Sequence, residues 1–136
     1  MKIKMNLETI TYNNERLAII LRHPYEPNGQ EFVSNNEDYL QMGAMNLEKG
    51  RILKPHIHKS RNEFVPITQE ALIMYKGKMR VDFYYEKKKI QDTIINEGDI
   101  IVLLSGGHGF EVLEKTKLIE IKQGQYIDQK MDKEYL

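Results

Sequence analysis

The chain carries four histidines, and three of them stand at positions suited to binding a metal ion. His56 and His58 are two residues apart, so in a strand their imidazoles would lie side by side on one face. Glu70 begins the apolar run that follows, and His108 comes after two glycines farther along. Three imidazoles and a carboxylate form a ligand set for a first-row transition metal. The sequence therefore predicts one divalent metal ion held by His56, His58, Glu70 and His108, and it leaves His23 in a surface loop without a role.

Two glutamates compete for the oxygen position of this ligand set. Four residues separate Glu63 from His58, whereas eleven residues separate Glu70 from it. Glu63 falls in the polar stretch 59–69, which we interpret as a loop over the site. Glu70 stands at the head of a predicted strand, and ligand geometry needs a stiff support. We therefore prefer Glu70, with Glu63 as the alternative.

Length and composition restrict the kind of protein this can be. A chain of 136 residues predicts a single domain over residues 1–136 with a real core. Lys and Arg together number 20, as do Asp and Glu, so no basic field attracts nucleic acid. The absence of cysteine excludes disulfides and thiolate metal sites. Residues 100–104, the longest aliphatic run, are too few to span a bilayer, and residues 1–6 do not begin a signal peptide. We expect a soluble cytoplasmic protein with no membrane partner.

Short β-rich runs separated by turn residues predict an all-β sandwich or barrel. The expected strands are residues 17–21, 37–47, 52–58, 72–75, 79–85, 90–95, 100–104, 110–113 and 118–121. Residues 76–78 and 114–117 are expected to be hairpin turns, because each contains turn-forming residues between two apolar runs. The charged tail, residues 128–136, is expected to be a short helix or a mobile end.

The register of the last hairpin predicts the walls of the site. A four-residue loop at 114–117 would pair Phe110 with Ile121 and His108 with Gln123. Phe110 and Gln123 would then share the interior face with His108, and we expect both to contact a substrate. The same register points three charged residues outward, although a slip of one residue would reverse every face. These residues are Glu111, Glu120 and Lys122.

The spacing of the site residues resembles the first motif of the cupin family. That motif is a glycine, five residues, His-x-His, a short gap, a glutamate, six residues and a glycine. Gly50, His56, His58, Glu70 and Gly77 fit it, with a gap of eleven residues where three or four are usual.

The second cupin motif begins with Gly-Asp and ends with a histidine, which Gly98, Asp99 and His108 match. Leu104 stands where a proline is usual, and the spacing before His108 is one residue short. The resemblance covers roughly residues 40–123 and implies a cupin-type jelly-roll β-barrel with the metal inside. Residues 106–110 and 120–126 are similar to small uncharacterised cupins associated with bacterial surface-sugar pathways.

The resemblance and the ligand set together imply a metal-dependent enzyme. The donors suit Fe, Mn, Ni or Zn and do not choose among them. Four protein ligands on an octahedral ion leave two positions, which a substrate could fill through two oxygens. We expect an isomerase or epimerase acting on a polar, oxygen-rich small molecule such as a sugar or sugar nucleotide, with its catalytic base unassigned. The alternatives are an Fe(II)-dependent dioxygenase, metal-free acid–base catalysis by His56 and His58, and a non-catalytic small-molecule-binding barrel.

Residues 17–21 carry a prediction about assembly. This run is apolar throughout, which is typical of a strand buried on both faces. A single barrel of this size covers one face from its own interior. We therefore expect a homodimer in which a partner chain covers the other face, and the alternative is that residues 31–38 fold back over it.

Overall fold

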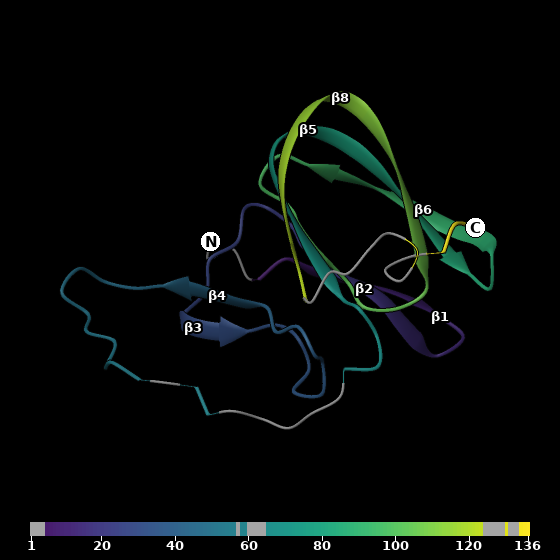
Figure 1. The fold of residues 1–136 in the computed structure, drawn as a ribbon. Coiled ribbons are helices and arrows are strands. Elements are labelled where there is room, and N and C mark those ends of the chain that lie inside the picture. Colours follow the sequence, from purple (N-terminus) through teal and green to yellow (C-terminus); the bar gives the residue numbers. More distant parts are fainter. Residues whose placement is uncertain (1–4, 57, 60–64, 124–129, 131–133) are drawn as a thin grey trace.

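A computed structural model describes residues 5–56, 58–59, 65–123, 130 and 134–136 (Figure 1). These residues form an all-β fold, as the sequence predicts, and none of their helical structure is long and apolar enough to span a membrane. The strands are β1 (Leu7–Tyr12), β2 (Glu15–Leu21), β3 (Gly29–Phe32), β4 (Gly43–Asn46), β5 (Glu70–Tyr85), β6 (Lys88–Asn96), β7 (Ile100–Leu103) and β8 (Gly107–Lys122).

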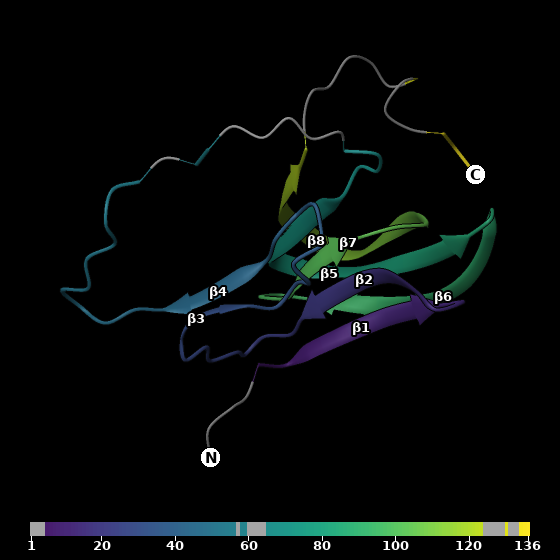
Figure 2. The ribbon, with the colours of Figure 1, turned by 90° about the horizontal axis from the view of Figure 1, so that it is seen from below.

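A strongly curled antiparallel sheet forms a half-barrel that carries most of the fold (Figures 1 and 2). Its strand order is β1-β2-β7-β5-β6, and β8 pairs with β5. The long strand β5 pairs with β7 near its start and with β6 near its end, while β8 runs along its other edge. Strands β3 and β4 form a separate two-stranded sheet.

The interior of the half-barrel is lined by alternate residues of β5. Met79, Val81 and Phe83 are each at most 3% exposed, which confirms the alternation expected for residues 79–85. Leu72 and Met74 belong to the same cluster. Because side chains alternate along a strand, β5 presents this row inward and its other residues outward.

Strand β2 is buried on both faces, and the chain itself supplies both covers. Leu17 and Ile20 pack in the cluster inside the half-barrel. Ile19 packs in a second cluster with Met42 and Ala44, on which Val33 and Leu40 also lie. The expected double burial is confirmed, but the cover comes from the segment that contains β3 and β4 and not from a partner chain. The double burial of β2 therefore does not require a dimer, and the dimer itself stays a prediction.

The two hairpins expected at residues 76–78 and 114–117 do not form. Strand β5 runs through Gly77 without reversing, and β8 runs through Thr116. The two strands pair with each other across this point, with register shifts between Met74 and Met79. A glycine inside a strand often marks a bulge, and Gly77 has a φ of +104°. The turn-forming residues here therefore bend two continuous strands.

The strand expected over residues 52–58 is absent where that segment is described, at residues 52–56 and 58. After β4, which belongs to the separate two-stranded sheet, the chain extends away from both sheets, as both ribbon views show (Figures 1 and 2). A strand needs a hydrogen-bonded neighbour, and Pro55 also removes a donor from this stretch. Residues 37–41 likewise form no strand, so β4 is shorter than the expected 37–47. Most of the tail, 128–136, lies outside the described residues.

An ionic cluster ties β5 to its two neighbours on the outer face. Asp82 accepts two hydrogen bonds from Arg80, at 2.8 and 3.1 Å, and its carboxylate lies 3.0 Å from the Lys89 ammonium. Arg80 also reaches Glu111 of β8 at 2.8 Å, which places Glu111 outward as expected. The hydrogen bond from Arg80, together with that from Lys89, lowers the pKa of Asp82 to about 2.

Candidate functional site

The side chains of Glu70 and His108 are in direct contact. Glu70 is the first residue of β5, and His108 is the second residue of β8. Leu103 lies opposite Glu70 in the sheet and precedes His108 by only five residues, so the short β7–β8 connection brings the imidazole back to the carboxylate. His108 Nε2 lies 2.5 Å from Glu70 Oε1, and the side chains are 30% and 14% exposed. The pair is thus a charge-assisted hydrogen bond at a partly sheltered position.

A pocket of about 760 Å³ opens beside this pair. Phe110 lines the pocket, and its contact with a substrate stays a prediction. Lys122 also lines it and does not point outward as expected, because it pairs with Glu70 and directly paired residues share a face. The expected hairpin register was therefore wrong for Lys122. The remaining lining residues are mixed in chemistry: Thr68, Tyr84, Glu86, Lys87, Gly106, Gly107, Gly109, Glu134, Tyr135 and Leu136.

Gln123 supports the site from behind and does not line the pocket. Its Oε1 accepts a hydrogen bond from the Gln69 backbone N–H at 2.7 Å. Gln69 is itself buried, and its side chain joins the Leu40 backbone N–H to the Leu104 carbonyl. These bonds fix the backbone immediately before Glu70. The substrate contact predicted for Gln123 stays a prediction, and the hydrogen bonds of Gln69 were not expected from the sequence.

His56 and His58 form a second pair, separate from the first. Their ring centroids are 5.2 Å apart although the expected strand does not form, and His56 Nδ1 lies 2.9 Å from the Lys54 carbonyl oxygen. Both histidines are exposed. Within the ranges that the structure describes, no group of three or more His, Asp or Glu residues is close enough to hold a metal ion. The alternative ligand, Glu63, lies outside those ranges.

The donors at the pocket fit half of the expected ligand set. Imidazole nitrogen and carboxylate oxygen both bind divalent transition metals at about 2.0–2.2 Å, which sets neighbouring donors about 3 Å apart. His108 Nε2 and Glu70 Oε1 are in direct contact at 2.5 Å. Their distance would have to increase by about half an ångström for both to bind one ion. The structure therefore assembles two of the four predicted ligands at one point and keeps the other two together on the segment after β4.

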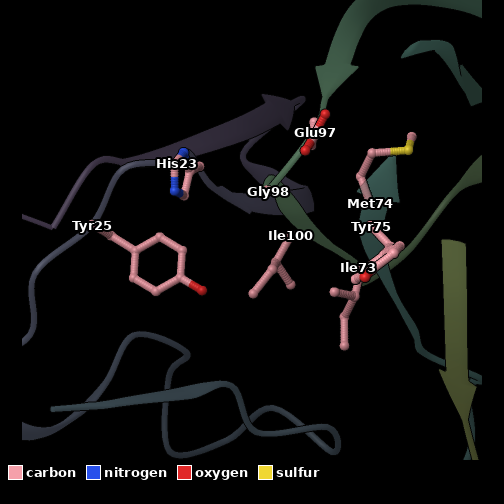
Figure 3. A pocket seen from close by; sticks show the side chains of 8 residues that line it. All are labelled: His23, Tyr25, Ile73, Met74, Tyr75, Glu97, Gly98 and Ile100. Carbon is pink, nitrogen blue, oxygen red and sulfur yellow. The ribbon is translucent and has the colours of Figure 1, made fainter. Parts of the chain in front are cut away.

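A second, smaller pocket lies where β6 turns into β7 (Figure 3). Its volume is about 390 Å³, and its lining includes Ile73, Ile100, Tyr25 and Glu97. His23, which was expected in a surface loop, also lines this pocket and meets Tyr25 edge-on with the ring centroids 6.3 Å apart.

No protein-family model, curated protein or solved structure matches this chain. The resemblance to the cupin family therefore rests on the residues of the two motifs.

Proposed function

We propose that the chain is a cupin-type jelly-roll enzyme that binds a polar, oxygen-rich small molecule in the pocket beside Glu70 and His108. The observation that carries the proposal is the contact between these two side chains, 38 residues apart in sequence, at the wall of a pocket of about 760 Å³. Pockets of this size with a few convergent polar groups are the usual sites of small-molecule chemistry. A sugar or sugar nucleotide undergoing isomerisation or epimerisation is the proposed substrate class.

In this proposal Glu70 and His108 hold one divalent transition metal together with His56 and His58. Iron, manganese, nickel and zinc all accept this mixture of nitrogen and oxygen donors. The metal would act as a Lewis acid on substrate oxygens. Lys122 lies opposite Glu70 in the sheet, with its side chain 26% exposed, and supplies a fixed positive charge to orient an electron-rich group of the substrate.

A second candidate is metal-free acid–base catalysis by the same pair, and the direct 2.5 Å contact favours it. If the proton of His108 resides on Nε2 and is hydrogen-bonded to Glu70, Nδ1 carries the lone pair and can accept a proton from a substrate. Glu70 would then fix the tautomer and stabilise the imidazolium. This differs from the arrangement expected from sequence, in which His56 and His58 were the acid and base.

Elemental analysis of the purified protein distinguishes these candidates. We expect about one transition-metal ion per chain, lost in His108→Ala and in the double variant His56→Ala/His58→Ala. His23→Ala is the matched control, because this histidine lies at the other pocket. A metal-free wild type whose turnover depends on His108 would favour the acid–base pair.

Turnover is then measured with sugar phosphates and nucleoside diphosphate sugars, by NMR for isomerisation and by an electrode for oxygen uptake. Oxygen uptake without isomerisation would favour the dioxygenase alternative. If Glu70→Gln and His108→Ala change neither metal content nor the binding of any of these compounds, the pocket is not the functional site.

We also retain the homodimer as a proposal, now with β8 as the contact. Among the described strands β8 pairs with β5 alone, so its other edge carries unpaired backbone groups that favour strand addition. Val112 and Ile119 on this strand are 60% and 54% exposed. Light scattering tests it: a mass near 16.1 kDa at micromolar concentration would rule the dimer out.

A further inference from the structure

The smaller pocket is separate from the larger one, because the two have no lining residue in common. Ile73, Met74 and Ile100 give the pocket an aliphatic surface, while Tyr25 and Tyr75 contribute aromatic rings. Figure 3 shows the Tyr25 ring reaching toward Ile100 across the open space. A volume of about 390 Å³ lies within the range of small-molecule sites.

Two backbone irregularities build this pocket. Gly98 has a φ of +84°, and its N–H donates to the Met74 carbonyl at 2.8 Å. A side chain at Gly98 would collide with His23, because an added Cβ would lie 2.7 Å from His23 Cγ. On β5 the register with β8 shifts between Met74 and Lys76, so Tyr75 is the extra residue of a bulge. Bulges re-aim side chains and are common beside functional sites.

The charge of the lining indicates which ligands fit. Glu97 is the one carboxylate in the lining, and no lysine or arginine contributes to it in the described part of the chain. The nearby Arg22 is neutralised by Glu8 and Asp99. The Tyr75 ring already attracts a cation, because the Lys117 ammonium lies 5.6 Å from its centroid.

We propose that this pocket binds a small organic ammonium ion, with alkyl groups against Ile73 and Ile100 and the positive charge near Glu97 and the tyrosine rings. Aromatic rings attract such ions through their negative faces, and a carboxylate adds a direct electrostatic attraction. The site is independent of Glu70 and His108, so either pocket can fail its test without affecting the other.

The test compares choline with 3,3-dimethyl-1-butanol, a neutral molecule of nearly the same shape. Each is titrated into ¹⁵N-labelled protein at constant ionic strength. We expect choline to shift the amide resonances of Tyr25, Tyr75 and Gly98 saturably, with a dissociation constant at least about fivefold lower than that of the neutral compound. Equal binding of the two compounds would show an apolar pocket without charge recognition and overturn the proposal. Absence of saturable shifts with choline up to about 50 mM would overturn it as well, since a dissociation constant near 1 mM is already weak binding.

Three variants locate the charge recognition. Tyr75→Leu should weaken choline binding about threefold, and Glu97→Gln should weaken it by a similar factor. Lys117→Met removes a competing ammonium from Tyr75 and should strengthen binding. Tyr39→Leu is the matched control, because Tyr39 is 47% exposed and does not line the pocket. If Tyr75→Leu, Glu97→Gln and Lys117→Met all bind choline as wild type and the control do, the ion binds elsewhere and the proposal is wrong.

Discussion

Replacement of Gly77 by alanine tests the continuous pairing of β5 with β8. An added Cβ at Gly77 would lie 2.5 Å from the Lys115 carbonyl oxygen and 2.6 Å from Thr116 Oγ1, so β8 would have to move away. The positive φ of +104° adds strain for any residue other than glycine, typically about 1–3 kcal/mol. Because the clash is with backbone and disturbs sheet hydrogen bonds, we expect Gly77→Ala to lower the free energy of unfolding by about 3 kcal/mol or more.

Gly29→Ala separates the two contributions. Gly29 also has a positive φ, +71°, but an added Cβ there would meet nothing within 4 Å. It should therefore lose only the conformational part, about 1–2 kcal/mol. Urea denaturation monitored by circular dichroism measures both variants, with the midpoint shift converted through a common slope. In the hairpin interpretation Gly77 would stand at an exposed tip with free space around it. Equal losses for the two variants would therefore refute the pairing of β5 with β8 at this point.

Three further predictions follow from buried or charged groups. Ionised Asp82 should stabilise the fold above pH 4, and that contribution should disappear as the pH falls from its ordinary pKa of 3.8 through about 2. The free energy of unfolding should fall by at most about 2 kcal/mol, and solvent screening of the charges on Arg80 and Lys89 makes the change smaller. The melting temperature of Asp82→Asn should lack this dependence on pH. Ile19→Asp should lower the free energy of unfolding by several kcal/mol even in dilute monomer, because the residues that cover Ile19 belong to the same chain. Destabilisation that appears only at concentrations where a dimer forms would contradict the packing of β2. Glu70→Gln should weaken metal binding by about tenfold or more in a chelator competition and Glu63→Gln should not, whereas the reverse order would identify Glu63 as the ligand.

Local pattern was sufficient to predict the buried strands. The unbroken apolar run of β2 and the alternation of Met79, Val81 and Phe83 both follow from residue type and period. Strand β1 was missed, although Asn13 and Asn14 carry a signal that could have found it. Both have positive φ values, 49° and 62°, and paired asparagines favour this kind of tight hairpin turn.

The same residue types could not distinguish a turn from a bulge. Lys76-Gly77-Lys78 is compatible with either, and the choice depends on whether β8 lies alongside, which no local pattern reveals. This ambiguity also affected the prediction of the site, because the face on which Lys122 lies depends on the register of β8. Glu70 and His108 could be named from their types, but their contact depends on the curl of the sheet and the short β7–β8 connection.

The antiparallel pairing of β8 with β5 also suggests how molecules enter the larger pocket. Pairing can advance like a zipper from Tyr84–Gly107, which are 23 positions apart in the chain, to Glu70–Lys122, which are 52 apart. Closing the longer loop, between Glu70 and Lys122, costs only about 0.7 kcal/mol more in entropy than closing the shorter one. The pairing can therefore extend along the two strands at little additional free-energy cost. Both terminal pairs lie at the pocket, because Glu70, Lys122, Tyr84 and Gly107 all line it. Terminal pairs of a sheet fray at the lowest free-energy cost, so fraying at either end of the β5–β8 pairing would widen the pocket while the middle of the pairing stays closed.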